Sequence, residues 1–537
     1  MPADRGLTDT PPTGRLTDAP PIGRRADVVP IGRRADVVLT GGLLVDGTGA
    51  PARPADVEVT GARISAVRPP GTGRAARVLD VAGRVVCPGF VDVHSHSDLA
   101  LLANPQAHSK VRQGVTTEIV GNCGLGVTPA TDEQALRAAV AFIDLDPALP
   151  WPRGGTTGHL RALEAAAPSL NVATLTGHLP LRASAVGFAD RPATTTELGA
   201  MREELARSLE EGALGLSTGL IYAPASYATE AELTALAEVV AEAGGVFAWH
   251  LRDYTDTLTE SVAQAVRVAE ATGCVTQISH LAAVGRRNWG AVARALDLIG
   301  DAPVHVDVYP YLAGSANLSQ LLPGWAHEGV RARERLAEPG ARDRVLAEWE
   351  GRWWDWPDIL VDGHPLESGE QALDLIAEHG NAVTMVAFGR CEEDLLTVLR
   401  HPATMIGSDG FALDPGGLTG GATPHPRSYG CYPRLLARYV GEGALTLEEA
   451  VRKSTGLPAE VFGLDGRGLI EEGAAADVLV LDPGTLNDLS TFDRPHQFPS
   501  GVELVLVNGV AVVESTGHTG AGPGQVLRAR GQIGVSA

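Results

Sequence analysis

Between residues 89 and 461, short apolar runs with β-strand character alternate with stretches of helical periodicity, such as TEAELTALAEVVAEAGG. Strands that alternate with helices predict repeated βα units and a parallel sheet. Eight strand-like runs occur, the number that builds a (β/α)8 TIM-like barrel. These runs are GFVDVHSH, TTEIVGNCG, NVATLTGH, GALGLSTG, GVFAWHLR, VTQISHL, VHVDVYPY and TMIGSDG.

The two ends of the chain have a different texture, with short alternating strands separated by glycine turns. ADVVLTGGLLVDGTGA lies near the start, and ADVLVLD and GVELVLVNGVAVVE lie near the end. The dipeptide Asn508-Gly509 is a hairpin signal within the last of these. The pattern predicts one small β domain built from both chain ends, over residues 35–88 and 462–530, beside a barrel over 89–461.

Two further segments interrupt this plan. Residues 1–34 contain LTDTPPTGR and PIGRRADVV, each followed by a near or identical copy. Such Pro/Gly/Arg units cannot bury an apolar face, and they predict a disordered extension without chemistry. A Trp-rich segment at about 320–358 follows the seventh strand-like run and predicts a helical cap over the barrel mouth.

Composition narrows the class of partner. The 537 residues carry a formal charge of −22, with a pI near 5.1. Nucleic acids and anionic membranes need clustered positive charge, so we expect neither as a partner, and a small molecule remains. No run approaches the ~18 apolar residues of a membrane span. Five cysteines without a CxxC pair indicate a reducing, cytoplasmic location, and no feature specifies an oligomeric state.

Histidines gather at the predicted strand ends. His94 and His96 are two residues apart, so both side chains can point to the same side of a strand. His250 and His280 end the fifth and sixth strand-like runs. Each histidine alone is equally compatible with packing or solvation. Four of them at three strand ends of one barrel favour a metal site, and nitrogen ligands in this number suit zinc.

Asp409 and Cys123 complete this set. Asp409 ends the eighth run, where its carboxylate can bind metal, take a proton, or cap the following turn. Cys123 ends the second run and is a core residue, a nucleophile or a ligand. A nucleophilic cysteine would need one histidine and leave the others unexplained. A zinc thiolate fits better, because the only lysines, Lys110 and Lys453, lie at no candidate strand end.

The sequence resembles the N-acyl-D-amino-acid deacylase (D-aminoacylase) family of the amidohydrolase superfamily from about residue 36 to 530. The motifs that carry the resemblance are CPGFVDVHSHSD, KVRQGVTTEIVGNCG, GLSTGLIYAPASYA, WHLRD, ISH, DVYPY, GSDG, HPRSYG and YPRLLARYV.

The resemblance implies a zinc-dependent hydrolase of linear amide bonds in which a β-sandwich lies beside the barrel. It implies one tight zinc on Cys123, His250 and His280. A second, weaker site would use His94, His96 and Asp409 and share Cys123. In this scheme Asp409 takes a proton from the metal-activated water and passes it to the leaving amine. The expected substrate is a small acylated molecule, most simply an N-acyl-D-amino acid.

The resemblance also implies that Tyr309 and Arg427 bind the substrate α-carboxylate. Packing for Tyr309 and a surface ion pair for Arg427 are the alternatives. A family lysine two residues after the sixth-strand histidine is Ala282 here, and Tyr254 stands where an acidic residue is usual. These departures leave open a second substrate class, a cyclic amide or an acylated specialised metabolite. A catalytically silent metal-binding or scaffold protein is a third possibility.

Overall fold

The computed structural model describes residues 35–143, 149–327, 332–421 and 423–529. The chain divides into two units, residues 1–34 and residues 35–537. The predicted N-terminal extension therefore lies outside the described residues. Over the described residues, no helix has both the length and the apolar character needed to cross a lipid bilayer.

All eight predicted strand-like runs form parallel strands, which confirms the α/β architecture. One sheet pairs three strands and another pairs six, and only Leu175 separates the two along the chain. A parallel bridge between Ser95 and Gly410 also links the ends of the first and last of these strands. The strands are β6 (Phe90–Asp92), β7 (Val115–Val120), β8 (Asn171–Thr174), β9 (Thr176–Gly177), β10 (Gly215–Gly219), β11 (Val246–His250), β12 (Val275–Ile278), β13 (Val304–Val308) and β18 (Thr404–Ile406).

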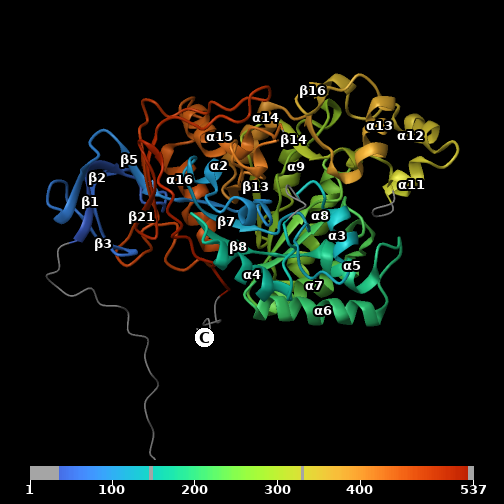
Figure 1. Ribbon diagram of the computed structural model, residues 1–537, viewed down its shortest axis with the longest axis horizontal. Coiled ribbons are helices and arrows are strands. Elements are labelled where there is room, and N and C mark those ends of the chain that lie inside the picture. The colour runs from blue at the N-terminus through green and yellow to red at the C-terminus, as the bar shows by residue number, and fades with distance from the viewer. Residues whose placement is uncertain (1–34, 144–148, 328–331, 422, 530–537) are drawn as a thin grey trace, which may run out of the picture. The chain divides into compact units, whose positions relative to one another are not determined.

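Helices connect these strands, as the alternating pattern predicts. Their apolar residues recur at intervals of three and four, and in α8 the buried side chains Leu258, Val262, Ala265 and Ala269 form one face. Figure 1 shows α6 and α7 along the outer edge of the parallel strands. The connecting helices are α4 (Gly155–Ala166), α5 (His178–Val186), α6 (Thr195–Glu210), α7 (Glu230–Glu242), α8 (Leu258–Thr272), α9 (Ala291–Asp297) and α14 (Glu392–Arg400).

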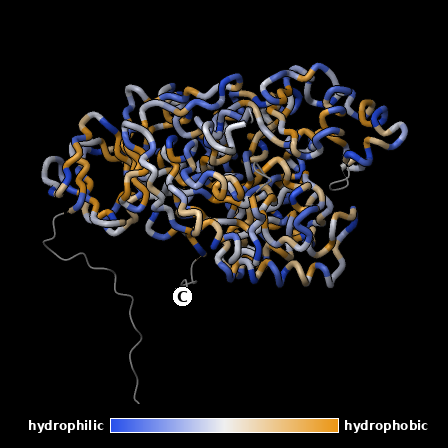
Figure 2. The backbone as a smooth tube through the Cα atoms, in the orientation of Figure 1, coloured by the Kyte–Doolittle hydropathy of each residue, from blue (hydrophilic) through white to orange (hydrophobic). Residues whose placement is uncertain are grey.

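The chain ends form one nine-stranded sheet, in which β5 pairs antiparallel with β19. Figure 2 shows long hydrophobic stretches in its strands. Asn508 and Gly509 have φ values of 48° and 78° and form the predicted two-residue hairpin turn between β20 and β21. The strands are β1 (Ala35–Leu44), β2 (Arg53–Thr60), β3 (Arg63–Arg68), β4 (Ala75–Asp80), β5 (Val85–Pro88), β19 (Val478–Leu481), β20 (Val502–Val507), β21 (Val510–Glu514) and β22 (Gly517–His518).

The segment after β13, where the sequence predicts a cap, contains helices and also an antiparallel sheet that the sequence pattern did not reveal. Its strands have two to five residues, so their alternation is too short to be distinctive. The elements are β14 (Ala313–Asn317), α10 (Gly324–His327), α11 (Ala332–Leu336), α12 (Ala341–Trp349), β15 (Ile359–Val361), β16 (His364–Pro365), α13 (Gly369–His379) and β17 (Thr384–Phe388). They share an apolar core of their own, and Figure 1 shows α11, α12 and α13 grouped together.

The remaining helices lie at the two ends of the parallel strands' segment. They are α1 (Ala100–Ala103), α2 (His108–Val111), α3 (Glu133–Ala139), α15 (Arg427–Arg434), a π-helix at Leu435–Val440, α16 (Leu447–Ser454) and α17 (Gly456–Val461).

Candidate metal centre and substrate cavity

The carboxyl ends of the parallel strands bring the six predicted metal ligands together. They form two groups in which all potential ligand atoms lie within 4.8 Å of one another. All six side chains are buried, and Cys123 belongs to both groups. The first group is His94, His96, Cys123 and Asp409, and the second is Cys123, His250 and His280.

The spacing of these atoms fits zinc. Ligands at about 2.0–2.3 Å from one tetrahedral zinc lie about 3.3–3.5 Å from each other. In the second group His280 Nε2 lies 3.6 Å from Cys123 Sγ and 3.1 Å from His250 Nδ1. In the first group His94 Nε2 lies 3.2 Å from Cys123 Sγ and 3.4 Å from Asp409 Oδ1. Two nitrogens, one sulfur and a carboxylate are also donors that zinc accepts.

Three of the six residues have a left-handed backbone. The φ values are 54° at Cys123, 38° at His280 and 51° at Asp409. This conformation is unfavourable by about 1–2 kcal/mol for a residue with a Cβ. Each of the three lies just beyond the end of its strand, where the turn directs the side chain toward the other candidate ligands. Such strained positions cluster at functional sites.

Asp307, which was not among the predicted site residues, holds two of the histidines. Its carboxylate lies 3.1 Å from His94 Nδ1 and accepts a hydrogen bond of 2.9 Å from the His280 backbone N–H. A carboxylate on the far nitrogen of a histidine fixes the ring so that the near nitrogen can bind metal. The sequence did contain a signal, since Asp307 occupies the centre of VDV in the seventh run, as Asp92 does in the first.

Asp92 and Lys110 form a second buried support. Lys110 Nζ lies 2.7 Å from Asp92 Oδ2 and 2.7 Å from a Glu118 oxygen. Asp92 also accepts a hydrogen bond of 2.8 Å from the backbone N–H of Ser408, one residue before Asp409. These contacts join β6 to the loop after β18, so Lys110 is engaged as a structural cation.

Burial keeps the two histidines of the second group in the neutral form that metal binding requires. Burial lowers the pKa of His250 to about 3, and burial together with His250 lowers that of His280 far below its usual value. Both imidazoles are therefore neutral and keep a lone pair for metal. Burial raises the pKa of Cys123 to about 11 even though His94 opposes it. A catalytic cysteine would need a lowered pKa.

A cavity of about 520 Å³ opens beside this cluster. His250, His280 and Asp409 lie on its wall, together with Tyr309 and Arg390. Three tryptophans of the inserted segment also line this cavity, namely Trp325, Trp353 and Trp354. The predicted role of tryptophans in packing is also present, because Trp349, Trp354 and Trp356 contact one another.

The two residues predicted to bind the substrate carboxylate both lie at this site, but only Tyr309 lines the cavity, and Arg427 is paired with Asp409. Tyr309 is buried and faces the cavity. The guanidinium of Arg427, at the start of α15, is buried and lies 2.8 Å from Asp409 Oδ2. Burial acts to raise the pKa of Asp409, but Arg427, His94 and His96 outweigh it and hold the pKa well below its usual value. Asp409 is therefore an anion.

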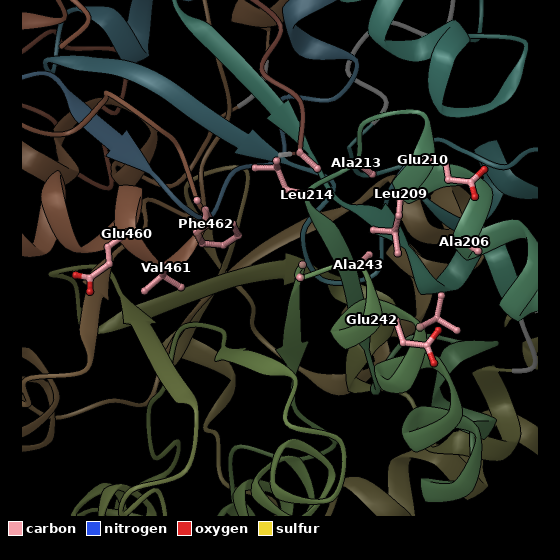
Figure 3. Close-up of a pocket in the computed structure, with 15 residues that line it drawn as sticks. Ala206, Leu209, Glu210, Ala213, Leu214, Glu242, Ala243, Glu460, Val461 and Phe462 are labelled. Atoms are coloured by element: carbon pink, nitrogen blue, oxygen red, sulfur yellow. The ribbon is translucent and has the colours of Figure 1, made fainter. Parts of the chain in front are cut away.

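A second cavity, of about 420 Å³, lies elsewhere (Figure 3). It is lined by Glu210, Glu242 and Glu460 and by apolar residues such as Leu214, which precedes β10. Figure 3 shows Glu460 on the opposite side of the view from Glu210. None of the candidate ligands lines this cavity, which lies near the amino ends of the strands. Active sites of such folds assemble at the carboxyl ends, so the 520 Å³ cavity is the candidate substrate site.

Comparison with known proteins agrees with this geometry. The Amidohydrolase family model matches residues 77–357 and 378–513. An N-acyl-D-glutamate deacylase from Alcaligenes xylosoxydans xylosoxydans is 37% identical over 498 residues, which cover 91% of this chain and 96% of that protein. The chain belongs to the N-acyl-D-amino-acid deacylase (D-aminoacylase) family of the amidohydrolase superfamily.

Two solved structures of the deacylase family are described with a metal site. The N-acyl-D-glutamate deacylase of Bordetella bronchiseptica, complexed with zinc and a phosphonate mimic of the tetrahedral intermediate, is 35% identical with a TM-score of 0.79. The match covers 93% of this chain and all of that one. A D-aminoacylase with a binuclear metal centre is 35% identical with a TM-score of 0.77, over 92% of this chain and all of that one.

The departures from the deacylase motifs have visible structural consequences. Ala282 is buried and brings no charge to the site. The hydroxyl of Tyr254 accepts a hydrogen bond of 2.9 Å from the Leu251 N–H, and its ring packs against His250 and His280. Tyr254 therefore braces the second ligand group. His178 contacts Thr218 and Glu232 and belongs to neither ligand group.

Proposed function

We propose that this deacylase hydrolyses the amide bond of N-acyl-D-amino acids to give a carboxylate and a free D-amino acid. The observation that carries the proposal is the pair of ligand groups sharing Cys123, with Asp409 in the first of them and on the wall of a cavity that is also lined by Tyr309 and Arg390. The relatives named for N-acyl-D-glutamate and D-amino-acid substrates support the same reaction.

We further propose that the parallel strands form a closed (β/α)8 barrel over residues 89–461, with the inserted segment as its cap. The strand order β6-β7-β8, then β9-β10-β11-β12-β13-β18, and the bridge from Ser95 to Gly410 support closure. The nine-stranded sheet over 35–88 and 462–530 would be the β-sandwich domain, and residues 1–34 would be a separate extension.

Within this scheme Cys123, His250 and His280 would hold the tighter zinc. His94, His96 and Asp409, with Cys123 shared, would hold a second and weaker ion. A bound zinc ion supplies a water with a pKa near 7 and polarises the acyl carbonyl. His96 Nδ1 and His250 Nε2 are buried without a hydrogen-bond partner among the described residues, so each ring's other nitrogen is its engaged atom.

Residues of the chain then move the proton and hold the reacting groups in place. Asp409 is anionic and can accept a proton from the attacking water. It can then deliver that proton to the leaving nitrogen, which must be protonated to depart as an amine. Arg427 and His96, at 2.8 and 2.9 Å from its two oxygens, hold the carboxylate in place. Asp307 and Asp92 orient the segments that carry His94, His280 and Asp409.

A screen of amine release by zinc-replete enzyme tests this function. We expect activity on N-acetyl-D-amino acids, none on the L-enantiomers, and a loss of at least about a thousandfold in kcat for Asp409→Asn, consistent with removal of a general base and of its charge. Absence of amine from every acyl-D-amino acid, or equal rates for Asp409→Asn and the unaltered chain, would contradict the proposal.

The same screen addresses a second candidate substrate. Because Ala282 supplies no cation, a substrate without an α-carboxylate remains compatible with the hydrolytic centre. Cyclic amides and acylated specialised metabolites are therefore included in the screen. Ring opening or deacylation of these, without activity on acyl-D-amino acids, would favour that alternative.

A further inference from the structure

The cavity contains a guanidinium without an acidic partner, that of Arg390. Its Nη2 donates a hydrogen bond of 2.7 Å to the hydroxyl of Tyr309. Its Nε and Nη1 are buried and have no hydrogen-bond partner, and no carboxylate of the described residues lies within 4.0 Å of them. Buried N–H groups of a cation are unfavourable unless an acceptor reaches them, so this guanidinium is arranged for a ligand.

The guanidinium of Arg427, unlike that of Arg390, has an acidic partner. The guanidinium carbons of Arg390 and Arg427 both lie 4.6 Å from the centre of the Tyr309 ring. Arg427, however, is paired with Asp409 and donates to the backbone oxygen of Ser315 at 3.3 Å. It does not line the 520 Å³ cavity, whereas Arg390 does. Of these two cations beside Tyr309, Arg390 is the one available to a substrate.

The inserted sheet holds Arg390 firmly. Strand β17 ends at Phe388, which pairs with Ala313 at the start of β14. The Arg390 N–H donates to the Leu312 oxygen at 3.3 Å, and the Gly285 N–H donates to the Gly389 oxygen at 2.8 Å. A Cβ at Gly389 would lie 2.7 Å from the Trp353 ring, so only glycine permits this close packing. The guanidinium is thus positioned before a ligand arrives.

We propose that Arg390 binds the α-carboxylate of the acyl amino acid, and this rests on the proposed function. Two pairs of N–H donors on this planar guanidinium match a carboxylate, Nη1 with Nη2 and Nε with Nη2, and the second Nη2 proton is not used by Tyr309. Tyr309 accepts from Arg390, and its own proton reaches no acceptor among the described residues, so the hydroxyl can donate to the same carboxylate. Arg390 thereby brings, from β17, the positive charge that Ala282 does not bring from β12.

Arg390 could equally bind a side-chain carboxylate, such as that of an acyl glutamate. Matched pairs of substrates therefore test whether it binds the α-carboxylate or the side-chain carboxylate. The assay measures kcat and KM of the zinc-replete full chain on N-acetyl-D-leucine and N-acetyl-D-leucinamide, which differ only at the α-carboxyl group. N-acetyl-D-glutamate and N-acetyl-D-glutamine form the second pair, which differs only in the side chain. Variants are Arg390→Met, Arg390→Lys and, as the control, Arg286→Gln, an exposed arginine outside the cavity.

We expect Arg390→Met to lower kcat/KM on N-acetyl-D-leucine by about 10- to 200-fold, mainly through KM, which is the range for one charged hydrogen-bonding partner. On N-acetyl-D-leucinamide the change should stay below about threefold, because that substrate presents no charge to lose. Arg390→Lys should fall between the two because it keeps the charge and loses the fork. Arg286→Gln should match the unaltered chain on all four substrates.

Equal losses on leucine and leucinamide substrates would overturn the proposal. So would a loss confined to the difference between glutamate and glutamine, which would move Arg390 to the side chain. Zinc content and the thermal unfolding midpoint of each variant identify a misfolded protein. If Arg390→Met is misfolded, the comparison of substrates is made with Arg390→Lys instead. If the unaltered chain releases amine from no acyl-D-amino acid, the proposed function itself fails. If it does and the Arg390 pattern is absent, only this inference fails.

Discussion

The candidate metal centre and the region around Arg390, where we propose that the substrate carboxylate binds, are assembled from different parts of the chain. Every candidate metal ligand lies within four residues of the end of a parallel strand. Arg390, which also lines the cavity, follows a strand of the inserted sheet, and the tryptophans belong to that insertion. The candidate metal centre thus depends on the regular framework, while the insertion adds Arg390 and the tryptophans to the substrate cavity.

The two regions also differ in how their charged groups are paired. At the metal centre Asp307, Asp92 and Lys110 hold the ligand-bearing segments through buried hydrogen bonds. Arg390, by contrast, has no carboxylate within 4.0 Å, and its Nε and Nη1 have no hydrogen-bond partner, among the described residues. A substitution in the first region should therefore remove metal and all activity, whereas one in the second should change which substrates are used.

The largest effect is expected for Cys123→Ala. Cys123 is the one residue shared by both ligand groups, so its removal should abolish stoichiometric zinc and lower kcat at least about a thousandfold, because zinc supplies the activated water. Metal analysis and amine release measure the two effects. The matched control is Cys274→Ala, a buried cysteine outside both groups, which should keep zinc and lose only stability. Retention of full zinc by Cys123→Ala would assign Cys123 to the core.

A smaller effect is expected for Asp307→Asn. The substitution keeps the size of the side chain and removes the charge that orients His94, so zinc affinity should fall by about 10- to 100-fold, the usual effect of losing such a support. Competition with a chelator of known affinity measures this, and excess zinc should restore much of the activity. Unchanged affinity would mean that Asp307 only fills space between β13 and its neighbours.

The difference between the two regions also explains what the sequence could reveal. The six candidate ligands could be predicted because each ends a strand, and alternating side chains together with chain order bring strand ends to one edge. Asp307 lies in the same pattern, but the pattern does not distinguish an inward carboxylate that orients a metal ligand from one that has only a structural role. The position of Arg427 was predicted, but its pairing with Asp409 depends on the fold of the loop after β18.

Arg390 could not be predicted by this reasoning. It follows a five-residue strand whose partner, β14, lies about 70 positions earlier in the chain, and the local pattern AFGRC contains no signal of that pairing. Residues in insertions are placed by long-range register, which a single sequence does not specify. The sequence shows that Ala282 stands in place of the family lysine. Only the structure shows that a cation from another strand, Arg390, lies in the same cavity.

The smallest effect is expected for Ala282→Lys, which should restore a cation on the β12 side. In the unaltered chain kcat/KM on N-acetyl-D-leucine should rise less than about threefold, because Arg390 already supplies the charge. In the Arg390→Met background the lysine should recover about tenfold on this substrate and nothing on N-acetyl-D-leucinamide, since a charged hydrogen bond is worth that much. Ala282→Met, of similar length without charge, is the control. A gain of tenfold or more in the unaltered chain would mean that Arg390 does not replace the missing lysine.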